Sequence, residues 1–394
     1  MVDTEGPRPA AMMVDADAHV TEPTDLWERE APPGRRNDVP HYETDEEGRV
    51  AMWIGPDRVS AARKVDESAY YAGEVPTIVN DVGLRLSYMN QTGFWAQVCY
   101  PNVGGTVLGR LLSIKDAPIL DFCVRTYNDW LADWARPSGG RLVPVAMLPL
   151  QDVAASVREL TRAVDLGHRA VLLPHRPEEM GLPLLVDRAW DPLWQACQDA
   201  DVPITFHGGF GDDLNRKRLY NPDWRGLGYA GAASMGSIVA FMDNAEVLLL
   251  LMFSGIFQRF PGLRVASAES GIGYIPYLLE AADWHYAATR MREERPEFDR
   301  PPSEYFKGRV YTTYWFERSG PARLLDEIGV DTVMFETDFP HRTSLYGQSQ
   351  TTGRPLQEII ADGVESLRPE DRSKVLWENA ARLFRIAVPA GQPA

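Results

Sequence analysis

Eight short apolar segments rich in β-formers alternate with segments of helical periodicity, and this alternation limits the possible folds more than any other feature. The strand-like segments are Met12–Ala18, Phe94–Tyr100, Leu142–Leu148, Ala170–Leu173, Val202–His207, Arg264–Ala268, Val310–Phe316 and Thr332–Glu336. The helix-like segments include Val153–Leu166, Trp190–Asp199, Ile272–Ala288, Pro321–Ile328 and a terminal helix, Pro369–Phe384. Eight repeats predict an α/β fold, a (β/α)₈ TIM barrel. An open, doubly wound sheet is disfavoured because no GxGxxG follows the first strand.

The chain has 394 residues and exceeds a minimal barrel through inserts. The inserts are 31–81, with a hairpin expected around Asp45–Gly48, 208–244, and 340–354. Each follows the C-terminal end of a strand, the face on which barrels build active sites, so we expect lids or substrate walls there. We predict one domain over 1–387 and a disordered tail over 388–394.

Composition excludes several classes of partner. Acidic residues outnumber basic residues by 56 to 40, for a net charge of −16, which argues against nucleic acid or an anionic membrane. The three cysteines show no CxxC spacing, so no disulfide framework is expected. The first 13 residues lack the apolar core of a signal peptide, and the longest apolar run, Val247–Phe253, is too short to span a bilayer. A cytoplasmic protein is expected.

The first strand carries an unusual concentration of ionisable residues. Asp15, Asp17 and His19 alternate along it, so we expect them to share the face that points into the barrel. Such groups are costly in an apolar interior unless their charge is compensated. A divalent metal compensates them directly, and a network of buried hydrogen bonds is the alternative.

Other strand ends carry the same residue types. His175, His207 and Glu269 follow strands four, five and six, and Asp338 and His341 follow strand eight. A single histidine at such a position is more often structural than a ligand. Because parallel strands end at one face of a barrel, the set is expected to converge there. The sequence therefore predicts a metal site at this face.

Four further stretches make the pattern recognisable. They are Leu148–Asp152, Asp191–Trp194, Gly255–Pro261 and Glu378–Phe384. With these, the chain resembles the amidohydrolase-related branch of the amidohydrolase superfamily, which contains aminocarboxymuconate semialdehyde decarboxylase. The resemblance implies HxH on strand one, histidines on strands five and six, and an aspartate on strand eight. His19, His207 and Asp338 match this pattern.

Two positions depart from it, because Asp17 replaces the first histidine of HxH and Glu269 replaces the strand-six histidine. No lysine lies in 170–175 to form a carbamate bridge. A carboxylate-rich site suits hard, redox-active metals better than zinc. The substituted chain is also similar to the TIM-barrel nonheme diiron monooxygenases of diterpenoid antibiotic biosynthesis (platensimycin and platencin), a group thought to act largely on coenzyme A-linked substrates.

Our leading hypothesis is therefore a diiron monooxygenase that uses dioxygen and an electron donor to hydroxylate an apolar acyl-coenzyme A. The expected metal ligands are Asp17, His19, Glu22, His207, Glu269, Asp338 and His341, with His175 as a further candidate. Among them, Asp338, His207 and Glu269 are the candidate catalytic residues. Four basic residues are candidates for holding the coenzyme A phosphates, although a solvated surface explains them equally well: Arg176, Arg216, Lys217 and Arg218.

Two alternatives stay open. The first is a mononuclear zinc or manganese hydrolase or nonoxidative decarboxylase, in which Asp338 acts as a general base or helps to protonate a carbanion. This enzyme would need neither dioxygen nor a reductant. The second is a barrel that binds a ligand without catalysis. A homodimer is expected only by analogy with relatives.

Overall fold

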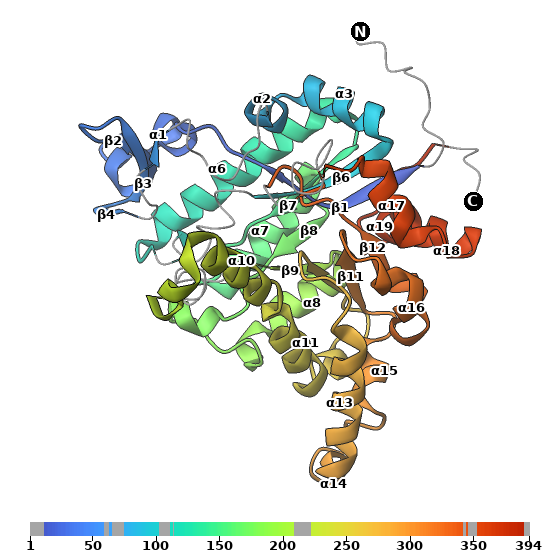
Figure 1. Cartoon of the computed structure of the whole chain (residues 1–394). Helices are drawn as coiled ribbons and strands as arrows, with labels where there is room; N and C mark the ends of the chain where they lie inside the picture. Colours follow the sequence, from blue (N-terminus) through green and yellow to red (C-terminus); the bar gives the residue numbers. More distant parts are fainter. Residues whose placement is uncertain are drawn as a thin grey trace.

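The computed structural model describes residues 12–58, 63–64, 75–101, 111–112, 114–208, 222–341, 344–345 and 353–389. Eight parallel strands form its centre, each hydrogen-bonded to the next in chain order (Figure 1). They are β1 (Met13–Val20), β6 (Phe94–Pro101), β7 (Leu142–Ala146), β8 (Ala170–Leu172), β9 (Ile204–His207), β10 (Val265–Ala268), β11 (Val310–Tyr314) and β12 (Val333–Phe335). The eight predicted strands and the predicted barrel are confirmed.

The first and last strands meet just beyond the end of β12. Ala18 and Phe339 form a parallel bridge there. The His19 N–H donates to the Phe339 carbonyl at 2.6 Å, and the Asp338 N–H donates to the Asp17 carbonyl at 3.0 Å. This seam brings residues from the two ends of the chain side by side.

Helices surround the strands (Figure 1). They include α3 (Val82–Thr92), α6 (Ala117–Ala135), α7 (Val153–Leu166), α8 (Asp191–Asp199), α11 (Asp243–Phe253), α13 (Ile275–Ala288) and α16 (Ser319–Ile328). The predicted terminal helix is built from α18 (Pro369–Ser373), a π-helical turn (Lys374–Glu378) and α19 (Asn379–Leu383). Local signals set the ends of α7, because the Asp152 side chain accepts from Ala154 N and Ala155 N and Gly167 ends the helix at φ 113°.

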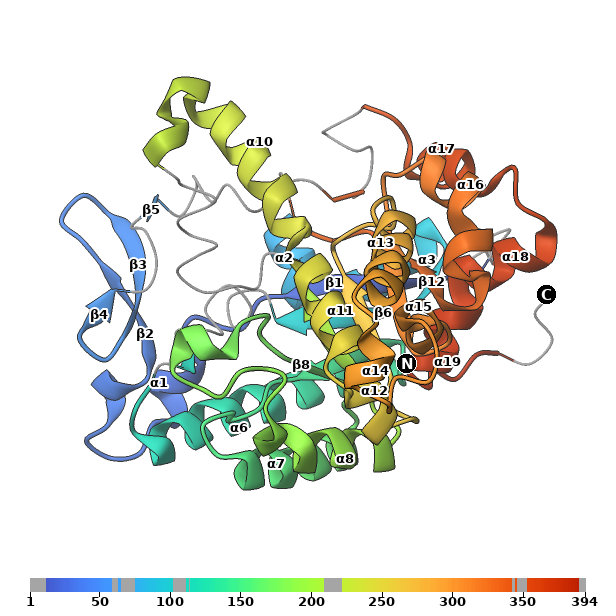
Figure 2. The ribbon, with the colours of Figure 1, turned by 90° about the horizontal axis from the view of Figure 1, so that it is seen from below.

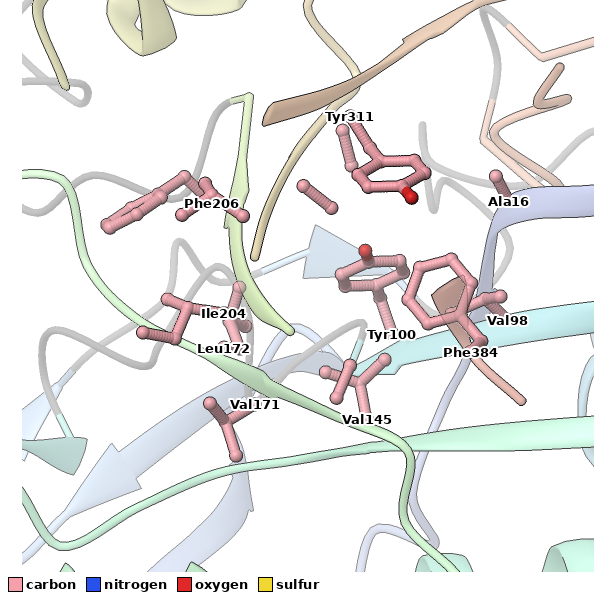
Figure 3. Packing of buried hydrophobic residues seen from close by; sticks show 14 of the residues in the cluster. Ala16, Val98, Tyr100, Val145, Val171, Leu172, Ile204, Phe206, Tyr311 and Phe384 are labelled. Atoms are coloured by element: carbon pink, nitrogen blue, oxygen red, sulfur yellow. The ribbon is translucent and has the colours of Figure 1, made fainter. Parts of the chain in front are cut away.

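Buried side chains fill the barrel and the space between strands and helices. Figure 3 shows residues of β1, β6, β7, β8 and β9 together with Phe384, from the end of the chain, in one cluster. Tyr100 is fully buried among them. The core thus joins the two ends of the chain.

The inserts add structure to the barrel. In 31–81, β2 (Pro40–Thr44) pairs antiparallel with β3 (Arg49–Ile54), which confirms the predicted hairpin. β4 (Asp57–Arg58) and β5 (Arg63–Lys64) extend this small sheet, which lies to one side of the barrel (Figures 1 and 2).

In the insert 208–244, residues 209–221 lie outside the described part of the chain, and α10 (Gly228–Phe241) leads into α11. Of the predicted tail, only the first two residues are described. The helical stretch Ala230–Phe253 is apolar and long enough to cross a membrane, and an 18-residue window within it has mean hydropathy 1.6, yet 44% of that window is buried within the protein. Core helices share these properties, so this is weak evidence for a span.

Candidate metal centre

Five ionisable side chains gather where β1, β9 and β12 end. Asp17 and His19 come from β1, His207 ends β9, and Asp338 and His341 follow β12. The first four are at most 1% exposed. Their ligand atoms form two groups within 4.8 Å: Asp17, His19 and His207, and His19, Asp338 and His341. These groups are positioned to hold a metal ion.

One nitrogen joins the two groups. His19 Nε2 lies 3.5 Å from Asp17 Oδ1 and 3.4 Å from Asp338 Oδ1. This nitrogen therefore lies near a carboxylate oxygen of each group, and its single lone pair can serve one ion. Burial first, and then the neighbouring His341, lower the pKa of His19 to about 3. The ring is therefore neutral at physiological pH, which is the state a metal ligand needs.

The tautomer of His207 indicates what faces its second nitrogen. Its Nδ1 lies 2.7 Å from the Gly208 carbonyl oxygen and 3.3 Å from Glu269 Oε2, so the proton belongs on Nδ1. Nε2 then carries the lone pair, and this nitrogen lies 2.9 Å from Asp17 Oδ2. Burial lowers the pKa of His207 to about 3. A lone pair that faces a carboxylate oxygen is the arrangement that a divalent cation satisfies.

The two aspartates differ in their charge environment. Burial, and after it the neighbouring Asp338, raises the pKa of Asp17. Burial would also raise the pKa of Asp338, but His341, with Nδ1 2.5 Å from Asp338 Oδ1, and His19 outweigh it and lower this pKa. The imidazoles beside Asp338 thus favour its ionised form, whereas the surroundings of Asp17 disfavour its charge.

Backbone geometry at two strand ends is uncommon. Glu269, after β10, has φ 48°, and Asp338 has φ 57°. Residues with a Cβ rarely adopt this region, and the exceptions concentrate at functional sites. Gly208 is required nearby, because a Cβ there would collide with the Glu269 carbonyl oxygen. The ends of β9 and β10 therefore approach closely only with glycine at 208.

Three predicted ligands lie outside both groups. His175 Nε2 contacts Asn244 Oδ1 at 2.5 Å. Glu22 is buried, and its charge contributes to the raised pKa of Tyr127, for which burial is the main cause. Glu269 contacts the His207 nitrogen that does not face Asp17. Of the four predicted carboxylates, the groups found in the described residues contain two.

The predicted phosphate-binding residues gain no support. Arg176 pairs with Glu246, and Asp243 lies 3.9 Å from its guanidinium, so its charge is compensated within the protein. Arg216, Lys217 and Arg218 lie outside the described residues.

Sequence reasoning offered a buried hydrogen-bonded network as an alternative role for Asp15 but did not identify its partners Gln97 and Arg85. Asp15 Oδ2 accepts from Gln97 Nε2 at 2.8 Å, and the Arg85 Nε donates to Gln97 Oε1 at 2.6 Å. Glu336 Oε2 accepts from the Glu269 N–H at 3.2 Å. The position of Glu336 at a strand end was a usable signal, whereas nothing in the local sequence marks Arg85.

The chain is similar to known decarboxylases. It is 30% identical over 290 residues to the γ-resorcylate decarboxylase of Polaromonas sp., covering 70% of this chain and 79% of that protein. An amidohydrolase from Mycobacterium avium subsp. paratuberculosis superposes with a TM-score of 0.74 at 20% identity, covering 95% of this chain and all of that one. A dihydroxybenzoic acid decarboxylase of Polaromonas sp., with bound manganese and the inhibitor 2-nitroresorcinol, gives a TM-score of 0.64 at 22% identity, covering 95% and 97%.

These relatives overturn the leading hypothesis. The two relatives from Polaromonas sp. are decarboxylases, so the predicted diiron monooxygenase of antibiotic biosynthesis is wrong, as are the two irons, the dioxygen, the electron donor and the acyl-coenzyme A substrate. The error arose from counting carboxylates. Four would neutralise two divalent ions, but among the residues that the structure describes only Asp17 and Asp338 contribute carboxylates to the groups around His19, and two carboxylates are the number that one ion needs.

The alignment with a family model extends over almost the whole barrel. The amidohydrolase family model matches residues 14–386, from β1 to the end of the terminal helix. The span includes every residue of the two groups described above. This chain therefore belongs to the amidohydrolase family.

Proposed function

We propose that this protein is a manganese-dependent, nonoxidative decarboxylase of an aromatic carboxylic acid of the hydroxybenzoate type. The observation that carries the proposal is the convergence of Asp17 and Asp338 on His19 Nε2, with the His207 Nε2 lone pair facing Asp17. Two carboxylates neutralise one divalent ion, and mixed carboxylate and imidazole ligands suit manganese. The decarboxylase relatives, one of them with bound manganese, support the same reaction.

Aromatic side chains beside the centre support an aromatic substrate. Phe241, at the end of α10, packs against Gly208, the neighbour of His207. The Phe241 ring meets the Trp315 ring edge to face, with centroids 5.4 Å apart. Trp315 directly follows β11 and is 2% exposed. An aromatic side chain beside the neighbour of His207 supports a flat ring rather than a flexible chain as the substrate.

The reaction balances without an oxidant. The bond between the ring carbon and the carboxylate breaks, carbon dioxide leaves, and the ring carbon keeps the electron pair and takes up one proton. Manganese, when bound, would supply a Lewis acid that orients the substrate oxygens and stabilises developing negative charge. Asp17, His19, His207 and Asp338 would hold it.

Glu269 is the group that we assign to proton delivery. It lies at the same barrel face as the ligands, contacts His207 Nδ1 at 3.3 Å and belongs to neither ligand group. At 7% exposure it is slightly more open to solvent than Asp17, His19, His207 and Asp338. It can therefore exchange a proton with solvent while it stands beside the reacting ring.

Anaerobic turnover tests the proposal. Protein stripped with a chelator and then reloaded with manganese is mixed with a panel of hydroxybenzoic acids, and carbon dioxide is measured. We expect release that requires manganese, at one ion per chain, and that proceeds without dioxygen or a reductant. Absence of release across the panel, from protein shown to hold manganese, would contradict the proposed substrate class. A strict requirement for dioxygen would contradict the reaction.

A further inference from the structure

A buried guanidinium lies behind the candidate metal centre. Arg85, on α3, is fully buried. Its Nη1 donates to the carbonyl oxygen of His19 at 3.1 Å, and its Cζ lies 4.0 Å from the centre of the Phe339 ring. One side chain therefore contacts the backbone of a candidate ligand on β1 and the ring of the residue that follows Asp338.

A chain of hydrogen bonds also links Arg85 to Thr337, the residue before Asp338. The Arg85 Nε donates to Gln97 Oε1 at 2.6 Å, and Gln97 Nε2 donates to Asp15 Oδ2 at 2.8 Å. Asp15 in turn accepts from the Thr337 N–H at 2.7 Å and from the Thr337 hydroxyl at 2.6 Å. The residues on both sides of Asp338 are thus tied to the same guanidinium.

Burying a guanidinium is expensive, and replacing a whole buried ion pair with apolar residues is often neutral or stabilising. Besides its bond to Gln97 on β6, Arg85 contacts both segments that meet at the seam between β1 and β12, through the His19 carbonyl and the Phe339 ring. At this seam, His19 Nε2 and Asp338 Oδ1 are 3.4 Å apart. Fixing the backbone on both sides of the seam fixes that distance.

We propose that Arg85 is a positioning residue for the metal centre, which holds His19 and Asp338 at the separation that one ion requires. This inference rests on the proposed function, since it presupposes that these residues bind manganese. Groups that orient metal ligands from outside typically change metal affinity by about 10- to 100-fold when they are mutated. An effect of that size is expected here.

The chain offers a matched control. Arg141, just before β7, is a partly buried guanidinium that donates to the carbonyl oxygens of Trp95 at 2.7 Å and Phe94 at 3.0 Å. Its Cζ lies 5.0 Å from the Trp95 ring centre. It therefore repeats the contacts of Arg85, with backbone carbonyls and an aromatic ring, at the beginning of β6 and away from the candidate ligands.

Manganese binding in Arg85→Met, Arg85→Lys and Arg141→Met tests the inference. Metal-free protein is titrated with manganese chloride, free ion is measured from its six-line electron paramagnetic resonance signal, and the spectrum of the bound ion is recorded. We expect about 10- to 100-fold weaker binding and an altered bound spectrum for Arg85→Met. Arg85→Lys keeps the charge but loses the planar guanidinium, so its manganese affinity should lie between those of Arg85→Met and wild type. Arg141→Met should bind as wild type does, even if its unfolding temperature falls.

The outcomes are distinguishable. If wild type binds manganese and both Arg85 variants bind it with unchanged affinity and spectrum, the inference is overturned and the proposed function stands. Equal weakening in Arg141→Met also overturns it, because general destabilisation would then explain the loss. If wild type binds no manganese, the proposed function fails and the inference fails with it. Should Arg85→Met not fold, Arg85→Lys decides by the same criteria.

Discussion

The ends of β8 and β9 present the same side chain in two different settings. Burial lowers the pKa of His175 to about 4 and that of His207 to about 3, so both imidazoles are neutral at physiological pH. The His175 Nε2 contacts the side-chain oxygen of Asn244, whose amide nitrogen donates to Phe206 O and Ser267 Oγ. The His207 Nε2 faces Asp17. Burial alone therefore does not identify a ligand. His175 Nε2 donates its proton to the Asn244 oxygen, whereas the His207 proton lies on Nδ1 and leaves the Nε2 lone pair facing Asp17.

Removing the β9 imidazole should have the largest effect. His207→Gln deletes the lone pair opposite Asp17 while it keeps an amide that can still contact Gly208. We expect manganese affinity to fall by more than the roughly 100-fold upper range seen for outer groups, and carbon dioxide release to be lost. Metal content after gel filtration and an activity assay measure both. Retention of a full equivalent of manganese would mean that His207 is not a ligand.

Glu269→Gln separates proton delivery from metal binding. The amide keeps the shape of the side chain beside His207 but has no proton to give. We expect kcat to fall by about 10²- to 10⁴-fold, the usual range for a positioned acid or base, with manganese affinity nearly unchanged. Steady-state kinetics on metal-loaded protein measure kcat, and a manganese titration measures the metal affinity. A large loss of metal with little loss of kcat would instead make Glu269 a ligand.

The pH dependence of metal binding tests the role assigned to Asp17. Burial raises its pKa above 3.8, so in metal-free protein this carboxyl holds its proton to higher pH than a free aspartate does. Manganese must displace that proton, so affinity should rise with pH, by about tenfold per unit while one proton is released. Manganese titrations between pH 5 and pH 8, compared with Asp17→Asn, measure the slope. A flat profile for wild type would contradict the assignment.

The smallest effect on the metal is expected at the end of β8. His175→Gln should cost about 1–3 kcal/mol of stability, because a buried hydrogen bond to Asn244 is disturbed, and should leave manganese affinity within a few-fold of wild type. Chemical denaturation and a manganese titration, run beside His207→Gln, complete the comparison. Loss of the metal from both variants to the same degree would restore His175 as a candidate ligand.

Strand 1 shows how far the sequence-based prediction extends. Strict alternation placed Asp15, Asp17 and His19 on one face, and we weighed a metal site against a hydrogen-bonded network. The pairing of β1 with β6 shifts register between Asp15 and Ala18. Asp15 accepts hydrogen bonds from Gln97 and Thr337, whereas Asp17 faces His19 and His207. The hydrogen-bonded network therefore applies to Asp15, whereas a metal at Asp17 stays a prediction.

The sequence did not give the number of metal ions, for a related reason. Glu22 lies two residues past the end of β1, so strand alternation does not set its direction. Glu269 sits in a left-handed backbone conformation, φ 48°, which turns its side chain in a way that the strand before it does not specify. Counting both as ligands doubled the negative charge assigned to the site and led to the incorrect prediction of two irons and dioxygen.

Periodicity along the chain was sufficient to predict eight strands, their helices and the barrel, because these depend on residues within one or two turns of each other. It also predicted that ionisable residues at the strand ends meet at one face, since parallel strands end together. Only the tertiary structure decided which lone pair faces which carboxylate, and that Arg85 reaches His19 from 66 positions away and Thr337 reaches Asp15 across 322. Those contacts depend on packing between distant segments, which no local pattern encodes.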